Sequence, residues 1–262
     1  MHWTDGYYGE LYLDSVEDLL TPALSALEAE VIARLLELVP GHRVLDLACG
    51  HGRHARVLAG RVGELWAIDR SGPYLARAAT SGPPNPALRL VQADLRALPF
   101  PPDTFDGIYS WYGSLFMFDD EENAAALAEL ARVLRPGGRA LVHHGNPLRL
   151  AREPCERSRR LLADGTVVEE DAVFDPATGL DRAERRMLRP GGSVLAGTSI
   201  LRYYRPAEWG PLARRAGLRI VELTSTTGAM PSPDHRERAG AADPSAGPGP
   251  DAPDLVALLE RT

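Results

Sequence analysis

VLDLACGHGRH, residues 44–54, is an apolar run that contains an acid and then passes through a glycine-rich turn. The apolar run predicts a buried strand, and a helix is expected to open near Gly52. Glycine lets a ligand come close to the backbone, and the amide hydrogens at the start of a helix carry partial positive charge. The stretch therefore predicts a strand, a turn and a helix that together suit a nucleotide-like ligand.

Taken alone, this turn is ambiguous. Residues 50–55 also fit the dinucleotide pattern G-x-G-x-x-A, and Asp69 lies about where a ribose-binding acid should follow. An NAD-dependent oxidoreductase is therefore one alternative, although Asp46 is an acid where dinucleotide strands are usually apolar. A non-catalytic module that keeps the pocket only as a scaffold is a second alternative.

Apolar runs alternate with helical stretches around this turn. Strands are expected at residues 43–47, 65–69, 88–93, 105–110 and 139–144. One helix is expected to begin at Thr21-Pro22, and another to run over 124–134 behind a cap at Asp119-Asp120. Strands that alternate with helices predict a doubly wound, Rossmann-like α/β sheet that is mostly parallel, with helices on both faces.

From Thr166 the pattern changes to strands separated by turn sequences. Three strands are expected, at 166–175, 181–188 and 194–204, as an antiparallel meander inserted into the α/β domain. The expected organisation is an N-terminal helical lid (1–40), an α/β core (41–165), the insert (166–205) and the end of the core (206–262). Within the last part, the proline-rich stretch 229–253 predicts a mobile loop, and 255–259 predicts a last, antiparallel strand.

The composition excludes several functions. All 29 basic residues are arginine, because the sequence contains no lysine, so chemistry that needs a lysine is excluded. The net charge of −7 argues against a nucleic-acid binder. His51 and His54 have no clear third and fourth ligand, so no metal is expected. The two cysteines, with no membrane-length apolar run and no basic-then-apolar leader, predict a cytoplasmic protein without membrane contact.

Over residues 41–144, the chain resembles the class I S-adenosylmethionine-dependent methyltransferases. In that family an acid ends the first strand, as Asp46 does, and the turn reads G-x-G-x-G, which residues 48–52 match with alanine at the first glycine. Residues 92–95 look like the family's adenine-binding segment, and Val-Leu-Arg-Pro-Gly-Gly at 133–138 is similar to its turn before the fifth strand.

The resemblance implies that S-adenosylmethionine is the cofactor and S-adenosylhomocysteine the product. It also implies that Asp69 binds the ribose hydroxyls, which suits a carboxylate because it accepts two hydrogen bonds from a diol. The other cofactor-binding residues expected are Tyr12, Ala48, Gly50, Gly52, Arg53, Arg70, Asp94, Leu95 and Ser110. The alternatives are that Arg53 is a solvated arginine at the start of a helix and that Asp94 is a helix cap.

The loop after the fourth expected strand bears on the substrate. Relatives that methylate nucleic-acid bases or glutamine amides often carry an Asn/Asp-Pro-Pro-Tyr-like segment there, whereas this chain reads Ser-Trp-Tyr-Gly-Ser-Leu-Phe at 110–116. This aromatic loop looks like the small-molecule branch, particularly natural-product N-methyltransferases that act on amino sugars and amine-bearing antibiotics. The resemblance implies methyl transfer to a small molecule at nitrogen, with an O-methyltransferase as the alternative.

Two residues are candidates for the reaction itself. Tyr8 clusters with Tyr7 and Tyr12 where this branch carries a lid, and such tyrosines form an aromatic wall beside a sulfonium or simply pack a helix. His144 ends the fifth expected strand, and ligands of such sheets bind beyond the strand ends. We therefore expect His144 to position the substrate or act as a base, the alternative being a solvated loop histidine.

The inserted meander is expected to cover the crevice or to form a contact in a homo-oligomer, because a sheet with one apolar face must bury it. Its acidic residues Glu169, Glu170 and Asp171 suit a cationic amine substrate, although a charge run is usually a solvated face.

Overall fold

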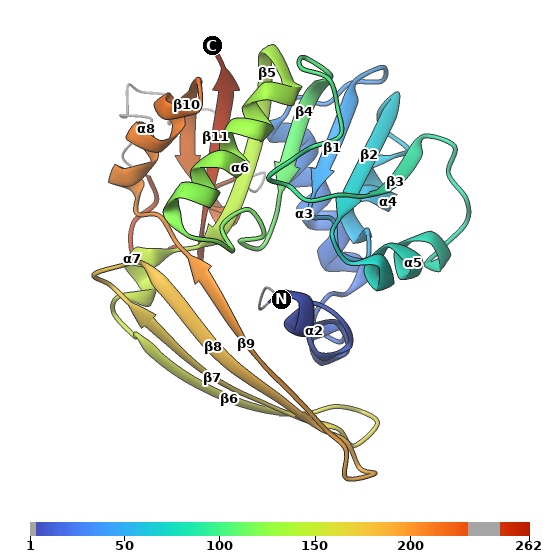
Figure 1. Ribbon diagram of the computed structural model, residues 1–262, viewed down its shortest axis with the longest axis vertical. Helices are drawn as coiled ribbons and strands as arrows, with labels where there is room; N and C mark the ends of the chain where they lie inside the picture. The colour runs from blue at the N-terminus through green and yellow to red at the C-terminus, as the bar shows by residue number, and fades with distance from the viewer. Residues whose placement is uncertain (1–3, 230–246) are drawn as a thin grey trace.

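The main sheet has the strand order β10-β11-β5-β4-β1-β2-β3 (Figure 1). These strands are β1 (Arg43–Leu47), β2 (Glu64–Asp69), β3 (Leu88–Gln92), β4 (Phe105–Ser110), β5 (Leu134–Gly145), β10 (Leu218–Thr224) and β11 (Asp254–Arg261). Strands β1 to β5 pair in parallel, whereas β11 runs antiparallel to both β10 and β5. The computed structural model, which describes residues 4–229 and 247–262, thus confirms the expected doubly wound sheet and its antiparallel last strand.

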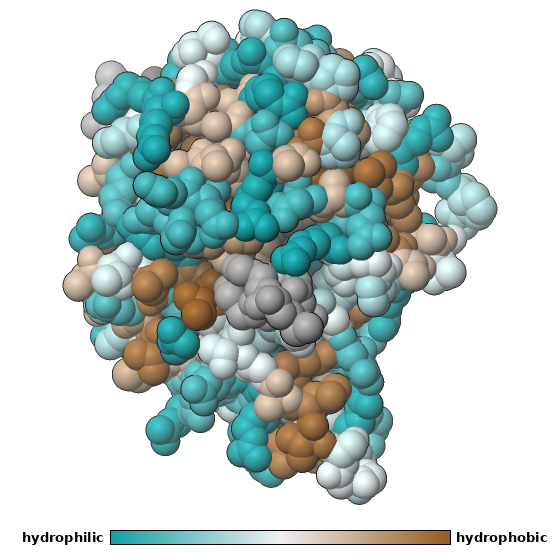
Figure 2. Space-filling view, in the orientation of Figure 1, coloured by the Kyte–Doolittle hydropathy of each residue, from teal (hydrophilic) through white to brown (hydrophobic). Residues whose placement is uncertain are grey.

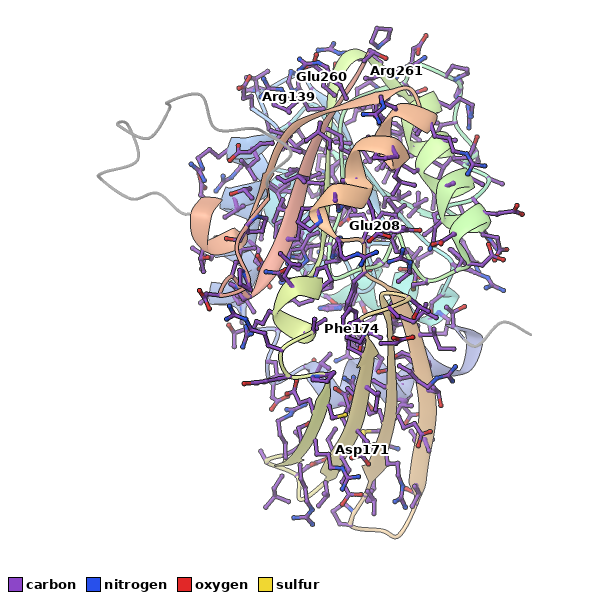
Figure 3. The ribbon with its side chains drawn as sticks, turned by 90° about the vertical axis from the view of Figure 1, so that its left-hand side faces the viewer. Arg139, Asp171, Phe174, Glu208, Glu260 and Arg261 are labelled. Carbon is purple, nitrogen blue, oxygen red and sulfur yellow. The ribbon has the colours of Figure 1, made fainter. Side chains whose placement is uncertain are left out.

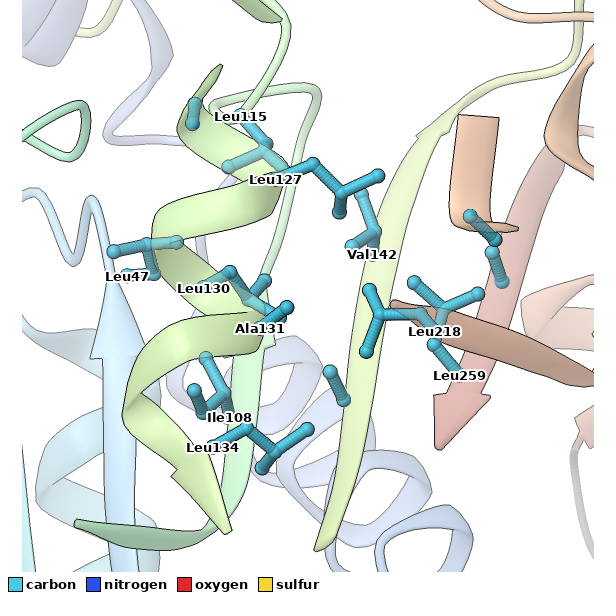
Figure 4. Packing of buried hydrophobic residues seen from close by; sticks show 14 of the residues in the cluster. Leu47, Ile108, Leu115, Leu127, Leu130, Ala131, Leu134, Val142, Leu218 and Leu259 are labelled. Atoms are coloured by element: carbon cyan, nitrogen blue, oxygen red, sulfur yellow. The ribbon is translucent and has the colours of Figure 1, made fainter. Parts of the chain in front are cut away.

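Helices cover both faces of this sheet. On one face lie α3 (Pro22–Leu35) and α4 (Arg53–Leu58), and on the other α6 (Asp120–Val133) and α8 (Pro206–Arg215), while α5 (Gly72–Thr80) packs against β2 and β3. Figure 4 shows Leu127 and Leu130 of α6 in one buried cluster with Val142 of β5. The core therefore lies between the sheet and its helices.

The helix ends have local causes. The Thr21 hydroxyl accepts a hydrogen bond from the backbone N–H of Leu24 (3.1 Å), which confirms the expected start of α3. Asp119 likewise caps α6. However, α6 ends at Val133, one residue before the expected end at 134, because Leu134 already pairs with Phe105 of β4.

A second sheet of four antiparallel strands extends from the main one (Figure 1). It consists of β6 (Cys155–Leu161), β7 (Val167–Asp175), β8 (Leu180–Leu188) and β9 (Val194–Arg202), and it follows the short helix α7 (Pro147–Leu150). Strand β6 was not expected from the sequence, because it is an exposed edge strand without an apolar face. Arginines on β6 instead pair with acids on β7, as Arg157 does with Asp171.

The N-terminal helices α1 (Thr4–Tyr7) and α2 (Glu10–Val16) pack on this second sheet, where Tyr7 and Leu11 form a cluster with Val168 and Met187. Ion pairs extend the contact in both directions. Asp14 pairs with Arg189 of the second sheet and also with Arg77 of α5. The N-terminal segment is thus tied to the insert and to the α/β core.

The expected mobile loop, 229–253, lies mostly outside the described residues. At its near end, Ala229 is the last residue of α9 (Thr226–Ala229). At its far end, the side-chain amide of Asn146 donates to the carbonyl oxygens of Gly249 (2.9 Å) and Ala252 (3.0 Å).

The face seen in Figure 2 is mainly hydrophilic, with hydrophobic residues in smaller groups. Among the helices of residues 4–229 and 247–262, none combines the length and the apolarity needed to cross a membrane.

Candidate active site

A cavity of about 520 Å³ opens at the carboxyl ends of β1, β2 and β3. Parallel strands bring these ends to the same edge of a sheet, which is where ligands of such folds bind. The N-terminal segment forms the opposite wall. The lining residues include Thr4, Tyr8, Gly9, Tyr12, Ala48, Gly50, Asp69, Arg70, Tyr74, Gln92, Asp94, Leu95, Tyr112, Ser114, Met117 and Phe118.

The glycine turn exposes its backbone to the cavity at Gly50. This residue has φ +57°, and a Cβ added to it would meet only the Tyr74 ring, at 3.9 Å. Ala48 also lines the cavity, and its φ of +64° is one that alanine adopts less readily than the glycine usual in the family. Gly52 does not line the cavity. A Cβ there would lie 3.2 Å from the Cβ of Ala78, so Gly52 allows the turn to pack closely on α5.

Asp69 stands at the end of β2 with both carboxylate oxygens oriented by the backbone. One oxygen accepts from the N–H of Gly50 and the other from the N–H of Ser71, each at 2.8 Å. Burial raises the pKa of Asp69, and these hydrogen bonds counteract that effect. A carboxylate has about four acceptor positions, so Asp69 retains capacity for two ligand hydroxyls.

Asp94 and Leu95 line the same cavity. The Arg96 guanidinium donates to Asp94 from Nε (3.0 Å) and Nη2 (2.7 Å), which lowers the pKa of Asp94. Arg70 also lines the cavity, and its guanidinium donates to the Thr4 hydroxyl (3.3 Å). The core and the N-terminal segment therefore meet across the opening.

Tyr8 and Tyr12 lie in the N-terminal wall, with their rings edge to face and their centroids 5.2 Å apart. Burial raises the pKa of Tyr8 well above its ordinary value, and the neighbouring tyrosines raise it further. Burial also raises the pKa of Tyr12, so both hydroxyls stay protonated at neutral pH. They can donate hydrogen bonds to a ligand, but they are poor bases.

Arg53 lies behind the lining. Its Nη1 donates to Glu28 and to the Ser25 hydroxyl (3.2 Å), and its guanidinium carbon lies 5.2 Å from the centroid of the Tyr112 ring. Burial opposes ionisation of Glu28, but the hydrogen bonds from His54 and Arg53 outweigh it and lower the pKa of Glu28 to about 2.

Two buried polar groups at the site have no hydrogen-bond partner among the described residues. They are Nη2 of Arg53 and the hydroxyl of Tyr74. A buried polar group without a partner is costly, so the hydroxyl of Tyr74, a residue that lines the cavity, fits a ligand with polar groups of its own. Together with the open side of Gly50, it shows that the residues present suit the cofactor implied by the resemblance.

The structure corrects the expectation for His144. Its side chain is fully buried, stacked between Tyr203 and Trp209 at 5.4 and 5.7 Å, and it does not line the cavity. Burial lowers the pKa of His144 to about 4, and Nδ1 lies 2.7 Å from the carbonyl oxygen of Gly145. Ser110 is also fully buried and outside the lining. Neither residue therefore lines this cavity.

Several lining residues were not singled out from the sequence. Met117 and Phe118 follow the aromatic loop at 110–116, and Tyr74 lies inside α5, a helix that was not expected from the sequence. Within residues 4–229 and 247–262, no group of three or more His, Cys, Asp or Glu side chains could hold a metal ion.

The sheet order, the glycine turn and the strand-end carboxylates together define the class I S-adenosylmethionine-dependent methyltransferase fold and site. A family model described as a methyltransferase domain matches residues 44–138. The chain is 34% identical over 211 residues to the ubiquinone/menaquinone biosynthesis C-methyltransferase UbiE of Bordetella avium, a match that covers 70% of this chain and 80% of that relative. The chain therefore belongs to the class I S-adenosylmethionine-dependent methyltransferases, and S-adenosylmethionine is its cofactor.

Two other relatives match over a shorter stretch. The match spans 57% of the length of one relative and 56% of the length of the other. The CcbJ methyltransferase of Streptomyces caelestis has a similar solved structure, with a TM-score of 0.75 at 23% identity over 97% of this chain and 98% of that one. CalS10, an amino pentose methyltransferase from Micromonospora echinaspora, matches with a TM-score of 0.68 at 19% identity over 97% and 98% of the two chains. At these identities both likenesses show a shared fold.

Proposed function

We propose that this protein transfers a methyl group from S-adenosylmethionine to an amine nitrogen of a small molecule, such as an amino sugar or another natural product. The observation that carries the proposal is the chemistry of the cavity. Among the described residues that line it, the carboxylates are Asp69 and Asp94, both engaged in hydrogen bonds, and none is a histidine. A neutral amine needs no strong base to attack a methyl group, whereas most hydroxyls do.

We assign the lining residues to parts of the cofactor, which supplies an electrophilic methyl group on a sulfonium. Asp69 would accept hydrogen bonds from the ribose hydroxyls, with Gly50 and Ala48 leaving room at the turn. Asp94 and Leu95 would contact the adenine, where Arg70 also lies.

At the other end of the cofactor, Tyr12 would bind the methionine carboxylate, and Arg53, which lies behind the Tyr112 ring, would attract it by its positive charge. Tyr8 would touch the acceptor as an aromatic wall and a hydrogen-bond donor. Its contribution is to align the nucleophile with the sulfonium and to exclude water, because methyl transfer is an in-line displacement.

The placement of the cavity supports a small acceptor. It is closed on one side by the N-terminal segment, which the insert sheet holds in place through Arg189 and through the cluster around Met187. CalS10, whose fold this chain shares, is described as an amino pentose methyltransferase.

Ring-carbon methylation of a quinone is the second candidate, because the Bordetella avium relative is a quinone C-methyltransferase. The apolar wall formed by Met117 and Phe118 would also suit a flat aromatic acceptor. A ring carbon that is activated by a hydroxyl group attacks most readily when that hydroxyl is ionised, so this second reaction, unlike attack by a neutral amine, would benefit from a base.

The two candidates are separated by incubating the protein with S-adenosylmethionine and three panels: amino sugars and other amines, phenols, and hydroxylated naphthoquinones. Mass spectrometry would follow the gain of one methyl group and the formation of S-adenosylhomocysteine. We expect N-methylated amines. A methyl group found only on a quinone carbon, or only on oxygen, would overturn the nitrogen assignment. Cofactor binding without turnover on any panel would favour a non-catalytic module.

A further inference from the structure

His143, the neighbour of His144 on β5, holds the loop that follows β4. Nδ1 of His143 accepts a hydrogen bond from the backbone N–H of Tyr112 (3.0 Å), and its carbonyl oxygen accepts one from the N–H of Gly113 (2.8 Å). Its ring stacks on Trp111, with centroids 4.5 Å apart and planes 8° from parallel. Three consecutive loop residues are thus in contact with this one histidine, which is almost completely buried.

Asp254 on β11 orients the histidine from the other side. Its Oδ2 lies 3.3 Å from Nε2 of His143, and its Oδ1 accepts from the backbone N–H of Thr226 (2.7 Å). Burial acts to raise the pKa of Asp254, but the hydrogen bonds from His143 and Thr226 lower it below its ordinary value. Because Tyr112 N–H is a donor, Nδ1 carries no proton, and the neutral ring donates from Nε2 to Asp254.

The loop needs such support because Tyr112 has φ +59°, a left-handed conformation that a tyrosine seldom adopts. Tyr112 lines the cofactor cavity, and its ring lies beside the Arg53 guanidinium. The preceding residue, Trp111, donates from Nε1 to Glu28 (3.2 Å), which is the acceptor for Arg53 as well. The conformation of residues 111–113 therefore decides where this wall of the cavity stands relative to Arg53.

We propose that His143, whose ring Asp254 orients, positions Tyr112 through Nδ1 and thereby shapes the end of the cavity that receives the methionine part of the cofactor. His143 is a positioning residue that acts through Nδ1, and its partner comes from the antiparallel last strand. The inference rests on the assignment of the cavity to S-adenosylmethionine.

Two substitutions of the same residue test this role. In His143→Asn the side-chain oxygen takes the place of Nδ1 and still accepts from Tyr112 N–H, whereas in His143→Gln the amide nitrogen takes the place of Nε2 and leaves Tyr112 N–H without its acceptor. We expect His143→Gln to weaken S-adenosylmethionine binding about tenfold or more and His143→Asn to stay within about threefold of the unmodified protein. Titration calorimetry measures the Kd, and circular dichroism and the Tm check that both variants fold.

The KM for S-adenosylmethionine should rise in His143→Gln more than kcat falls. Equal cofactor affinity in the two variants, whether retained or lost, would overturn the positioning role. Binding by the unmodified protein without turnover would overturn only the proposed function. No binding by the unmodified protein would overturn the cofactor assignment and this inference with it.

Discussion

The two sheets of this protein are held together by different interactions. Central strands of the seven-stranded sheet are buried on both faces, as in β1, where four of five residues are buried. The four-stranded sheet buries one face against the N-terminal segment and leaves the other to charged residues such as Arg186 and Glu169. Figure 3 shows Asp171 well out on the four-stranded sheet and Phe174 near its junction with the α/β core.

This difference separates the parts of the chain that determine the stability of the fold from the parts that determine how a ligand fits. Burial of apolar surface on two faces leaves little tolerance for change in the main sheet. Exposed ion pairs contribute little each, so the outer face of the insert can vary while its inner face holds the N-terminal segment. Five predictions test this contrast, beginning with the largest expected effect.

Leu45→Ala should lower the free energy of unfolding by about 2–5 kcal/mol, because Leu45 is fully buried in the core and truncation leaves a cavity. Chemical denaturation measures the change. The matched control is Arg186→Ala, whose ion pair with Glu169 is long (3.8 Å) and exposed, and its effect should stay below about 1 kcal/mol. Similar losses in both variants would remove the contrast between the sheets.

Asp69→Ala should weaken S-adenosylmethionine binding about 100-fold, or about 3 kcal/mol, because two hydrogen bonds to a carboxylate are lost. Asp171→Ala, a carboxylate on the outer face of the insert, should leave the Kd unchanged. Titration calorimetry on folded samples of both variants decides the matter. An Asp69→Ala protein that binds as tightly as the unmodified one would disprove the ribose assignment.

Acid should destabilise the protein through His144. Burial lowers the pKa of His144 to about 4 in the folded state, while the unfolded chain regains a value near 6.5. The neutral His144 ring therefore makes its full contribution to the free energy of unfolding above about pH 6.5. As the pH falls towards 4, this free energy decreases by on the order of 2–3 kcal/mol. His144→Phe keeps a stacked ring without the titration, so its stability should fall less over this range in denaturation measurements.

The same variant tests the corrected role of His144. Methyl transfer at neutral pH should persist in His144→Phe, since the side chain does not reach the cavity. Loss of kcat without loss of fold would restore His144 to the site. Burial raises the pKa of Asp46 to about 7, so acid changes the stability through Asp46 in the opposite direction. Asp46 is present in both the unmodified protein and His144→Phe, so its effect cancels when the two are compared.

Arg189→Ala should have the smallest effect, a rise of up to about threefold in the KM for S-adenosylmethionine. Arg189 pairs with Glu10 (2.6 Å) and Asp14 (3.1 Å) of the N-terminal segment, and such partly exposed pairs contribute up to about 1 kcal/mol. The effect should shrink as salt is added. Arg157→Ala, whose partner Asp171 lies within the insert sheet, serves as the control and should not change the KM.

Much of the core and of the cofactor end of the site followed from the sequence. Asp69, Asp94 and Gly50 are far apart in the chain, but each follows or ends a parallel strand, so the order of the sheet brings them to one edge. Strand β6 could not be found by periodicity, since its charged residues are satisfied across strands rather than by burial.

The amino-acid sequence by itself determined the class of fold, the glycine turn and the strand-end carboxylates, because these depend on local pattern and on the fixed direction of parallel strands. The tertiary structure alone decided three further features. His143, rather than His144, contacts the loop at residues 111–113; Gly52 allows close packing on α5; and Tyr8 and Tyr12 line the cavity. The physical reason is that strand alternation sets neighbouring side chains on opposite faces, but only packing against other elements decides what each face meets.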